Sequence, residues 1–170
     1  PRPITYTNQK DRWQTFTDLN SASGISAYAL AFALNLSAIL GEDVPVGIVD
    51  VAYGGSSIQQ WMDKEALEGY GWVNETCSVF YNGMLHDVIK YTSKGFLWHQ
   101  GCSNAGVGGE TIYKELFTKF LNMIRTKIGD ANYPIITTQL SQYDVPWTAF
   151  RQAQFELTKE LNNVYMVSSI

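Results

Sequence analysis

The chain has 170 residues, enough for one typical domain with a sizeable core, and hydrophobic residues make up 45% of it, which excludes global disorder. Charged residues are only 16%, and the net charge of −4 includes no basic block, which argues against nucleic acid or a membrane surface as a partner. No apolar run approaches the roughly 20 residues that a bilayer span requires, so we expect no membrane span.

The first third of the chain predicts a helix, a strand and a short helix. Residues 25–40 form an apolar stretch followed by Gly41, the pattern of a helix that ends at a glycine. Because this stretch is apolar on most faces, we expect the helix to be largely buried. The β-branched run 46–51 predicts a buried strand. Ser57 and Gln60 then form a capping box, which predicts the start of a short helix.

Strands alternate with helices over the rest of the chain. Hydrophobic runs and periodicity predict strands at 94–100, 134–140 and 164–170, and helices at 112–128 and 147–161. Residues 64–92 predict a long loop with one helix near 82–91. This alternation implies right-handed crossovers and a parallel sheet with helices on both faces, which is an α/β fold.

Glycines and amides follow two of the predicted strands, at the sheet edge where parallel α/β folds bind ligands. Gly54 and Gly55 either leave backbone N–H groups free for a negatively charged oxygen or serve only as a tight turn. Gln100 and Asn104 lie on either side of Gly101 after the next strand. Their side-chain amides donate hydrogen bonds without titrating, which suits the stabilisation of an oxyanion.

Other reactive side chains give weaker indications. Cys102 with His99 or His86 would make a thiol nucleophile and base, but no glycine stands two residues after this cysteine. Ser56 lacks the second glycine of a nucleophile elbow. Cys77 and Cys102 predict two buried thiols, with a single disulfide as the alternative. The histidines lack metal-ligand spacing, so we expect no metal.

Several stretches in the same chain order resemble the sialate O-acetylesterase branch of the SGNH hydrolase superfamily, which includes acetylxylan-esterase relatives. They are 21–22, 44–49, 53–58 with Trp61, 81–84, 94–101, 103–105 and 151–154. The resemblance implies a flavodoxin-like parallel sheet and a catalytic serine, with a histidine and an acid near the C-terminus. It implies no metal or organic cofactor.

By this resemblance, the oxyanion hole comprises the Gly54–Gly55 turn and the block from Gln100 through Gly101 to Asn104, with the choice between the two amides left open. Cys102 stands where the family usually has Glu, and His99 where it often has Tyr. We expect substrate contacts from four residues: Ser56, Trp61, Asn82 and His99. The ring of Trp61 either stacks on a sugar or belongs to the core.

The family's nucleophile stretch belongs upstream of Pro1 and its Asp and His beyond Ile170, so we expect residues 1–170 to be one domain that is incomplete at both ends and inactive alone. The first strand of a flavodoxin-like sheet would lie between 46–51 and 96–100, and this chain does not supply it. Unpaired buried backbone groups cost about 1–3 kcal/mol each. Either another segment fills this slot or the two strands pair directly.

The sequence therefore predicts the central segment of a carbohydrate O-acetylesterase, which releases acetate from O-acetylated sugars such as sialic acid or xylan. The alternatives are a non-catalytic carbohydrate-binding module and an inactive remnant of the esterase. The expected partners are a small-molecule or polysaccharide O-acetyl ester and the missing N- and C-terminal segments of the same protein. The resemblance, with the low charge and the two cysteines, also predicts a secreted or periplasmic location.

Overall fold

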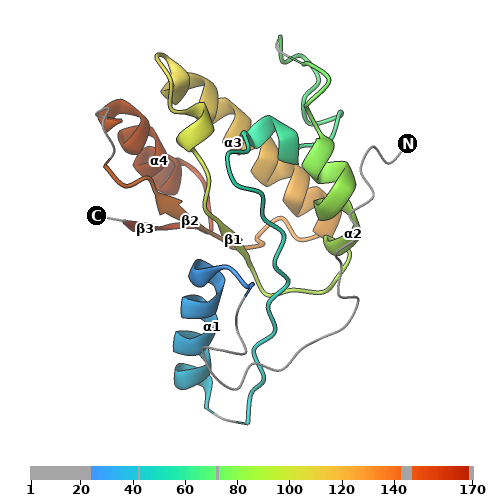
Figure 1. Ribbon diagram of the computed structural model, residues 1–170, viewed down its shortest axis with the longest axis vertical. Coiled ribbons are helices and arrows are strands. Elements are labelled where there is room, and N and C mark those ends of the chain that lie inside the picture. The colour runs from blue at the N-terminus through green and yellow to red at the C-terminus, as the bar shows by residue number, and fades with distance from the viewer. Residues whose placement is uncertain (1–23, 42, 72, 143–146, 169–170) are drawn as a thin grey trace. The chain divides into compact units, whose positions relative to one another are not determined.

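The computed structural model of this protein describes residues 24–41, 43–71, 73–142 and 147–168. Its described residues fall into two compact units, one up to Ala52 and one from Tyr53 onward, and each is taken by itself. The elements of both are drawn in Figure 1.

The first unit contains helix α1 (Ala27–Leu40) and an extended segment. Gly41 ends α1 with a φ of 91°, as the sequence predicts. The expectation of a largely buried helix is wrong, because Ala29 alone among its residues is buried. Within the described part of this unit no second helix or strand is available to cover the apolar surface of α1.

The strand predicted at 46–51 is also wrong, since residues 45–53 are neither helix nor strand. Val49, expected to be buried, is 46% exposed. An extended run becomes a strand only when a neighbour accepts and donates its backbone hydrogen bonds, and in the described residues the three strands of the sheet pair only with each other.

The second unit is an α/β layer with a three-stranded parallel sheet in the order β1-β2-β3 (Figure 1). Its main elements are β1 (Phe96–Trp98), α3 (Gly109–Ile128), β2 (Ile135–Gln139), α4 (Thr148–Glu160) and β3 (Val164–Ser168). The strands and helices predicted from residue 94 onward are all present, with β1 and β2 shorter than expected. The register aligns Trp98 with Thr137 and Thr137 with Met166.

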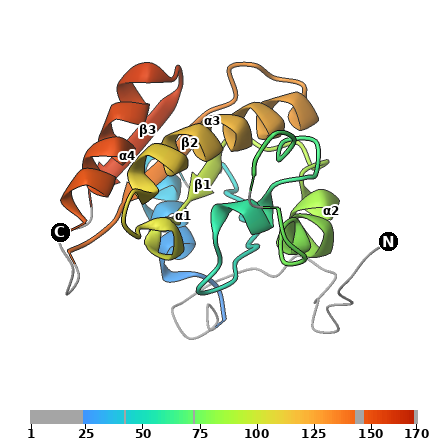
Figure 2. The same ribbon diagram turned by 90° about the horizontal axis from the view of Figure 1, so that it is seen from above.

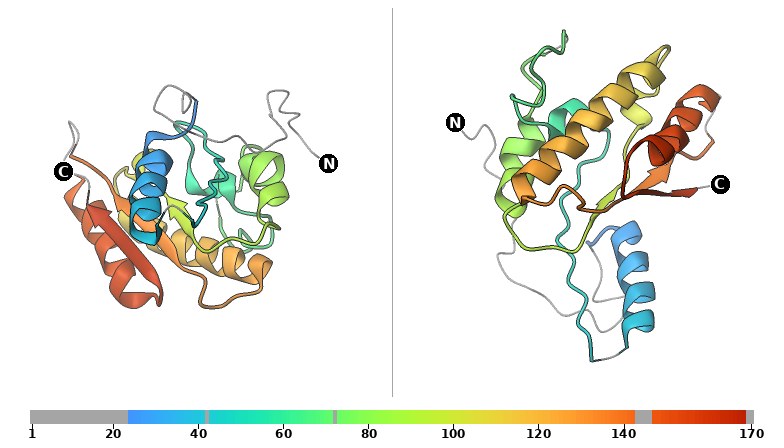
Figure 3. Two further views of the ribbon diagram at one scale, coloured as in Figure 1. Left: turned by 90° about the horizontal axis from the view of Figure 1, so that it is seen from below. Right: turned by 180° about the vertical axis from the view of Figure 1, so that it is seen from behind.

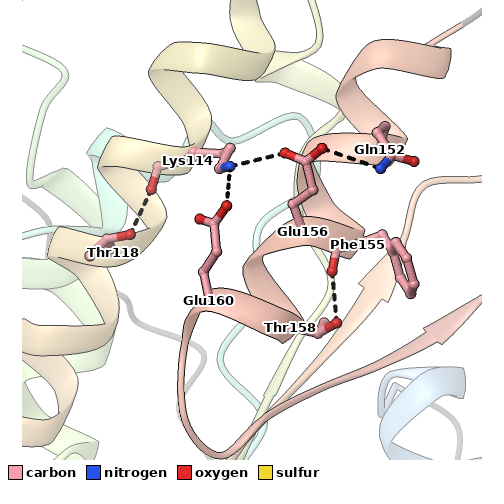
Figure 4. A network of polar contacts seen from close by, with 7 residues as sticks. All are labelled: Lys114, Thr118, Gln152, Phe155, Glu156, Thr158 and Glu160. Atoms are coloured by element: carbon pink, nitrogen blue, oxygen red, sulfur yellow. Dashed lines mark hydrogen bonds and ion pairs between the residues drawn. The ribbon is translucent and has the colours of Figure 1, made fainter.

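Helices α3 and α4 lie side by side on one face of this sheet, as Figures 2 and 3 show. Two crossovers of the same hand that move in the same direction place both helices on the same face. The indole ring of Trp98 on β1 packs 4.4 Å from the Phe120 ring on α3. Lys114 of α3 joins the two helices through ion pairs to Glu156 (3.0 Å) and Glu160 (2.6 Å) of α4 (Figure 4).

The hydrophobic core of this unit lies between the helices and the sheet. The predicted apolar face of α3 is buried except at its two ends, where Ile112 is 42% exposed and Ile128 is partly exposed. Four short elements surround the core: η1 (Ile58–Trp61), η2 (Tyr81–Leu85), α2 (His86–Val88) and η3 (Cys102–Asn104). The capping box predicted for the first of them is present. The helix expected near 82–91 is a five-residue π-helical turn followed by one short α-helical segment.

Candidate functional site

Hydrogen bonds of the neighbouring Ser56 hold the Gly54–Gly55 turn in place. The Ser56 hydroxyl donates to the Tyr53 carbonyl (2.8 Å) and accepts from the Trp61 indole N–H (2.8 Å). Gly55 has a φ of 75°, in the left-handed region that favours glycine. The N–H groups of Gly54 and Gly55 donate to no atom of the described segments, and both residues are exposed. Two backbone donors are thus available at this turn.

Two hydrogen bonds connect this turn to the loop that follows β1. The Ser103 hydroxyl donates to the Gly55 carbonyl (2.9 Å), and the Ile58 N–H donates to Asn104 Oδ1 (3.0 Å). The Ile58 N–H lies at the start of η1, where the N–H of Ser57 donates to Gln60 Oε1 (2.8 Å). The structure therefore brings together the glycine turn and the amide-bearing loop that the sequence singled out.

The two side-chain amides of this loop differ in how many of their N–H donors are already used in hydrogen bonds. Gln100 Nε2 donates to the Ser56 carbonyl (3.1 Å) and to Asn104 Oδ1 (2.7 Å), which uses both of its hydrogens. Asn104 Oδ1 accepts from Ile58 and Gln100, and Asn104 Nδ2 donates one hydrogen to Gln59 Oε1 (3.0 Å). Its second Nδ2 hydrogen has no partner in the described part of the chain. Asn104 is thus the amide with a donor to spare.

The carbonyl of Gln100 is held by two buried side chains. It accepts from the Tyr113 hydroxyl (3.3 Å) and from Gln154 Nε2 (3.4 Å). Gln154 is 1% exposed, and its Oε1 accepts the Leu140 N–H (2.9 Å), so it connects the ends of β1 and β2. Burial raises the pKa of Tyr113 well above the ordinary tyrosine value, which keeps its hydroxyl a neutral donor.

Gly101 has no room for a side chain. A Cβ at this position would lie 2.9 Å from Phe150 Cε1 and 3.2 Å from Gln154 Nε2, and its φ is 146°. Glycine at this position lets the loop turn against α4, and the part of Gly101 in the oxyanion block stays a prediction. Gln100 itself is 7% exposed, and its Oε1 is buried without a hydrogen-bond partner.

The four predicted substrate-contact residues differ in accessibility. Ser56 and Trp61 are 9% and 4% exposed, and they support the glycine turn from inside the core. Asn82 is partly exposed on η2, where its N–H donates to the Ser78 carbonyl (2.9 Å). His99 is exposed immediately before Gln100.

Both cysteines are unbridged, Cys77 being partly exposed and Cys102 exposed. The expectation of two buried thiols is therefore wrong, because Cys102 lies in the exposed turn that follows Gly101. His86, the other candidate base, is paired with its neighbour Asp87 (3.1 Å). Over the described segments, no group of three His, Cys, Asp or Glu side chains could hold a metal ion, and no helix is long and apolar enough to cross a membrane.

Sequence reasoning missed three residues of this network: Gln59, Tyr113 and Gln154. Gln154 shares the helical spacing of Phe150 and Leu157, so a polar residue on a buried helix face was the available signal. Nothing local in the sequence marks Gln59, whose partner Asn104 lies far along the chain.

A family model described as "carbohydrate esterase, sialic acid-specific acetylesterase" matches residues 4–170. The sialate O-acetylesterases of Homo sapiens and Pongo abelii are each 26% identical to this chain over 107 residues. That alignment covers 55% of this chain and only 20% of either relative.

Two solved structures are similar in fold. The crystal structure of a carbohydrate acetylesterase from Xanthomonas citri superposes with a TM-score of 0.69 at 30% identity, over 81% of this chain and 32% of that chain. A protein from Arabidopsis thaliana superposes with a TM-score of 0.50 at 20% identity, over 68% of this chain and 44% of that one, which is a likeness of fold alone. The chain thus spans a minor part of the length of these proteins.

Proposed function

Because the chain belongs to the sialic acid-specific acetylesterase family of carbohydrate esterases, we propose that it forms the oxyanion-hole part of a carbohydrate O-acetylesterase. In this reaction a serine attacks the acetyl carbonyl, and the carbonyl oxygen becomes negatively charged in the tetrahedral intermediate. Collapse of the intermediate releases the sugar hydroxyl, and water then frees acetate from the acyl-serine. By the resemblance, the serine, histidine and acid come from stretches of the protein before residue 1 and after residue 170.

The observation that carries this proposal is the hydrogen-bond count at the two amides. Asn104 keeps one free Nδ2 hydrogen, whereas Gln100 has none left, so Asn104 is the side-chain donor and Gln100 fixes its Oδ1. The N–H groups of Gly54 and Gly55 are the backbone donors. Such preorganised donors act on the charge that develops in the transition state, where they are worth more than in water.

The substrate we propose is an O-acetylated sugar, such as an acetylated sialic acid or xylan unit, either free or in a polysaccharide. Support comes from the names of the family and of its relatives. Asn82 and His99 remain the proposed substrate contacts, because they are at least partly exposed. Trp61 and Ser56 are proposed to act only through the turn that they support. No cofactor is needed for this chemistry, and a secreted or periplasmic location stays a prediction.

The test is Asn104→Ala in the full-length protein, assayed with a simple acetyl ester and with an acetylated sugar. Removal of one oxyanion donor lowers kcat by about 10²–10³-fold, and we expect KM to change little because the interaction forms mainly in the transition state. Asn122→Ala, at an exposed position of α3, is the matched control.

Unchanged kcat in Asn104→Ala would overturn the assignment of the donor. A wild-type protein that binds the acetylated sugar without hydrolysing any ester would instead favour the rival function, a non-catalytic carbohydrate-binding module. Gln100→Ala is expected to lower kcat as well, since it releases Asn104 Oδ1 from one of its two donors.

A further inference from the structure

Two consecutive residues of η1 form hydrogen bonds with the oxygen and the nitrogen of the Asn104 side-chain amide. The Ile58 N–H donates to Oδ1 (3.0 Å), and Gln59 Oε1 accepts from Nδ2 (3.0 Å). We propose that Gln59 is the positioning residue that directs the free Nδ2 hydrogen of Asn104 toward the oxyanion, an inference that rests on the proposed function above.

The two contacts define which way round the amide lies. If the Asn104 amide were flipped, its NH₂ group would face the Ile58 N–H and its oxygen would face Gln59 Oε1, so donor would oppose donor and acceptor would oppose acceptor. With Gln59 in place, one Nδ2 hydrogen is engaged and the direction of the other follows from the planar amide. Without Gln59, only the bonds to Oδ1 remain, and the donor end is free to move.

Gln59 is itself anchored from several sides. Its Nε2 donates to the Tyr70 hydroxyl (3.3 Å), and its backbone carbonyl accepts the N–H groups of Ser78 (3.0 Å) and Met62 (3.4 Å). The side chain therefore holds Asn104 from a fixed backbone position, close to the buried side chains of Met62 and Ser78.

The amides also form a directional series. Gln100 Nε2 donates to Asn104 Oδ1 (2.7 Å), Asn104 Nδ2 donates to Gln59 Oε1 (3.0 Å), and Gln59 Nε2 donates to Tyr70. In such a series each amide polarises the next, so an amide whose oxygen accepts two hydrogen bonds becomes a stronger donor through its nitrogen. In this series Gln59 is the residue that accepts a hydrogen bond from Asn104 Nδ2, the same nitrogen that is proposed to donate to the oxyanion.

The experiment compares Gln59→Met, Gln59→Glu and the surface control Gln152→Met in the full-length protein, with kcat, KM and the melting temperature measured for each. We expect Gln59→Met to lower kcat roughly tenfold, the scale of one ordinary hydrogen bond, with KM nearly unchanged. Gln59→Glu keeps an acceptor for Asn104 Nδ2 but adds a negative charge beside the place where the oxyanion forms, so kcat should fall in this variant as well, with KM nearly unchanged. Gln152→Met should leave all three quantities unchanged.

A double-mutant cycle separates this inference from the proposed function. If Gln59 acts through Asn104, then adding Gln59→Met to Asn104→Ala should cost no further turnover. A multiplicative loss in the double variant, or a Gln59→Met protein with wild-type kcat, would overturn the role of Gln59 while leaving Asn104 as the donor. If Asn104→Ala alone has no effect, the proposed function itself fails.

Discussion

Gly109→Ala tests whether the position of the Asn104 loop controls turnover. Gly109 is the first residue of α3, and a Cβ built on it would lie 2.1 Å from the backbone oxygen of Asn104. Real Cβ atoms essentially never approach closer than 3.0 Å, so the two segments must separate by about 0.9 Å, the difference of the two distances. A displacement of about 1 Å in a catalytic group costs on the order of 100-fold in rate.

The same substitution also strains the fold, because the atom that the Cβ meets belongs to the backbone and cannot move aside as the end of a flexible side chain does. Gly109 does not have a positive φ, and alanine favours a helix by about 1 kcal/mol over glycine, which offsets part of this strain. We therefore expect a lower melting temperature in circular dichroism and, at a temperature where the variant is folded, a kcat of the full-length protein that is on the order of 100-fold lower on a simple acetyl ester.

Gly106→Ala is the matched control, because it lies in the same loop with no atom within 4 Å of its Cβ and no positive φ. If Gly109→Ala and Gly106→Ala turn over equally fast, then the placement of Asn104 does not limit the reaction and the reasoning is refuted.

Two further predictions concern stability. Gln154→Met leaves the N–H of the buried Leu140 without its partner, which costs about 1–3 kcal/mol and should lower the melting temperature by several degrees. The control Gln152→Met, at an exposed position of the same helix, should leave the melting temperature unchanged. Equal melting temperatures for the two variants would contradict the role given to Gln154. The Lys114 ammonium lowers the pKa of Glu156, so this pair stabilises the fold above the unfolded pKa of Glu and ceases to do so as the pH falls through the lower, folded value. The melting temperature of Lys114→Met should therefore fall below that of the wild type at pH 7 and approach it in acid, and a pH-independent difference would exclude the ion pair as its cause.

Periodicity predicted the second unit well, because its elements carry local signals. The apolar face of α3 recurs with helical spacing, Gly129 ends that helix with a φ of 80°, and the parallel sheet follows from the alternation of strands and helices. The run 46–51 has an equally clear β-branched pattern and still forms no strand. A strand depends on a hydrogen-bonding neighbour, which is a property of the assembled sheet and not of the run itself.

The candidate site shows the same division between local and non-local information. The glycine turn and the Gln100–Asn104 loop were singled out from residue type and from predicted strand ends, since glycine and amides have a recognisable use there, although only the loop follows an observed strand. The choice between the two amides needed the hydrogen-bond partners of each, including the carbonyl of Ser56, which is 44 residues from Gln100 along the chain.

That choice has a chemical consequence for how the site is built. A buried amide that donates both hydrogens to protein acceptors is a structural element, since any new acceptor must first displace one of them. Gln100 is in that state, whereas Asn104 has two acceptor bonds, one donor bond and one hydrogen to spare. Asn104 is partly exposed and stands within the amide series, where one of its Nδ2 hydrogens has no acceptor among the described residues. The site loses little free energy when the oxyanion forms, because only this spare hydrogen changes its partner. Turnover should therefore depend more steeply on the residues that hold Asn104 than the stability of the fold does.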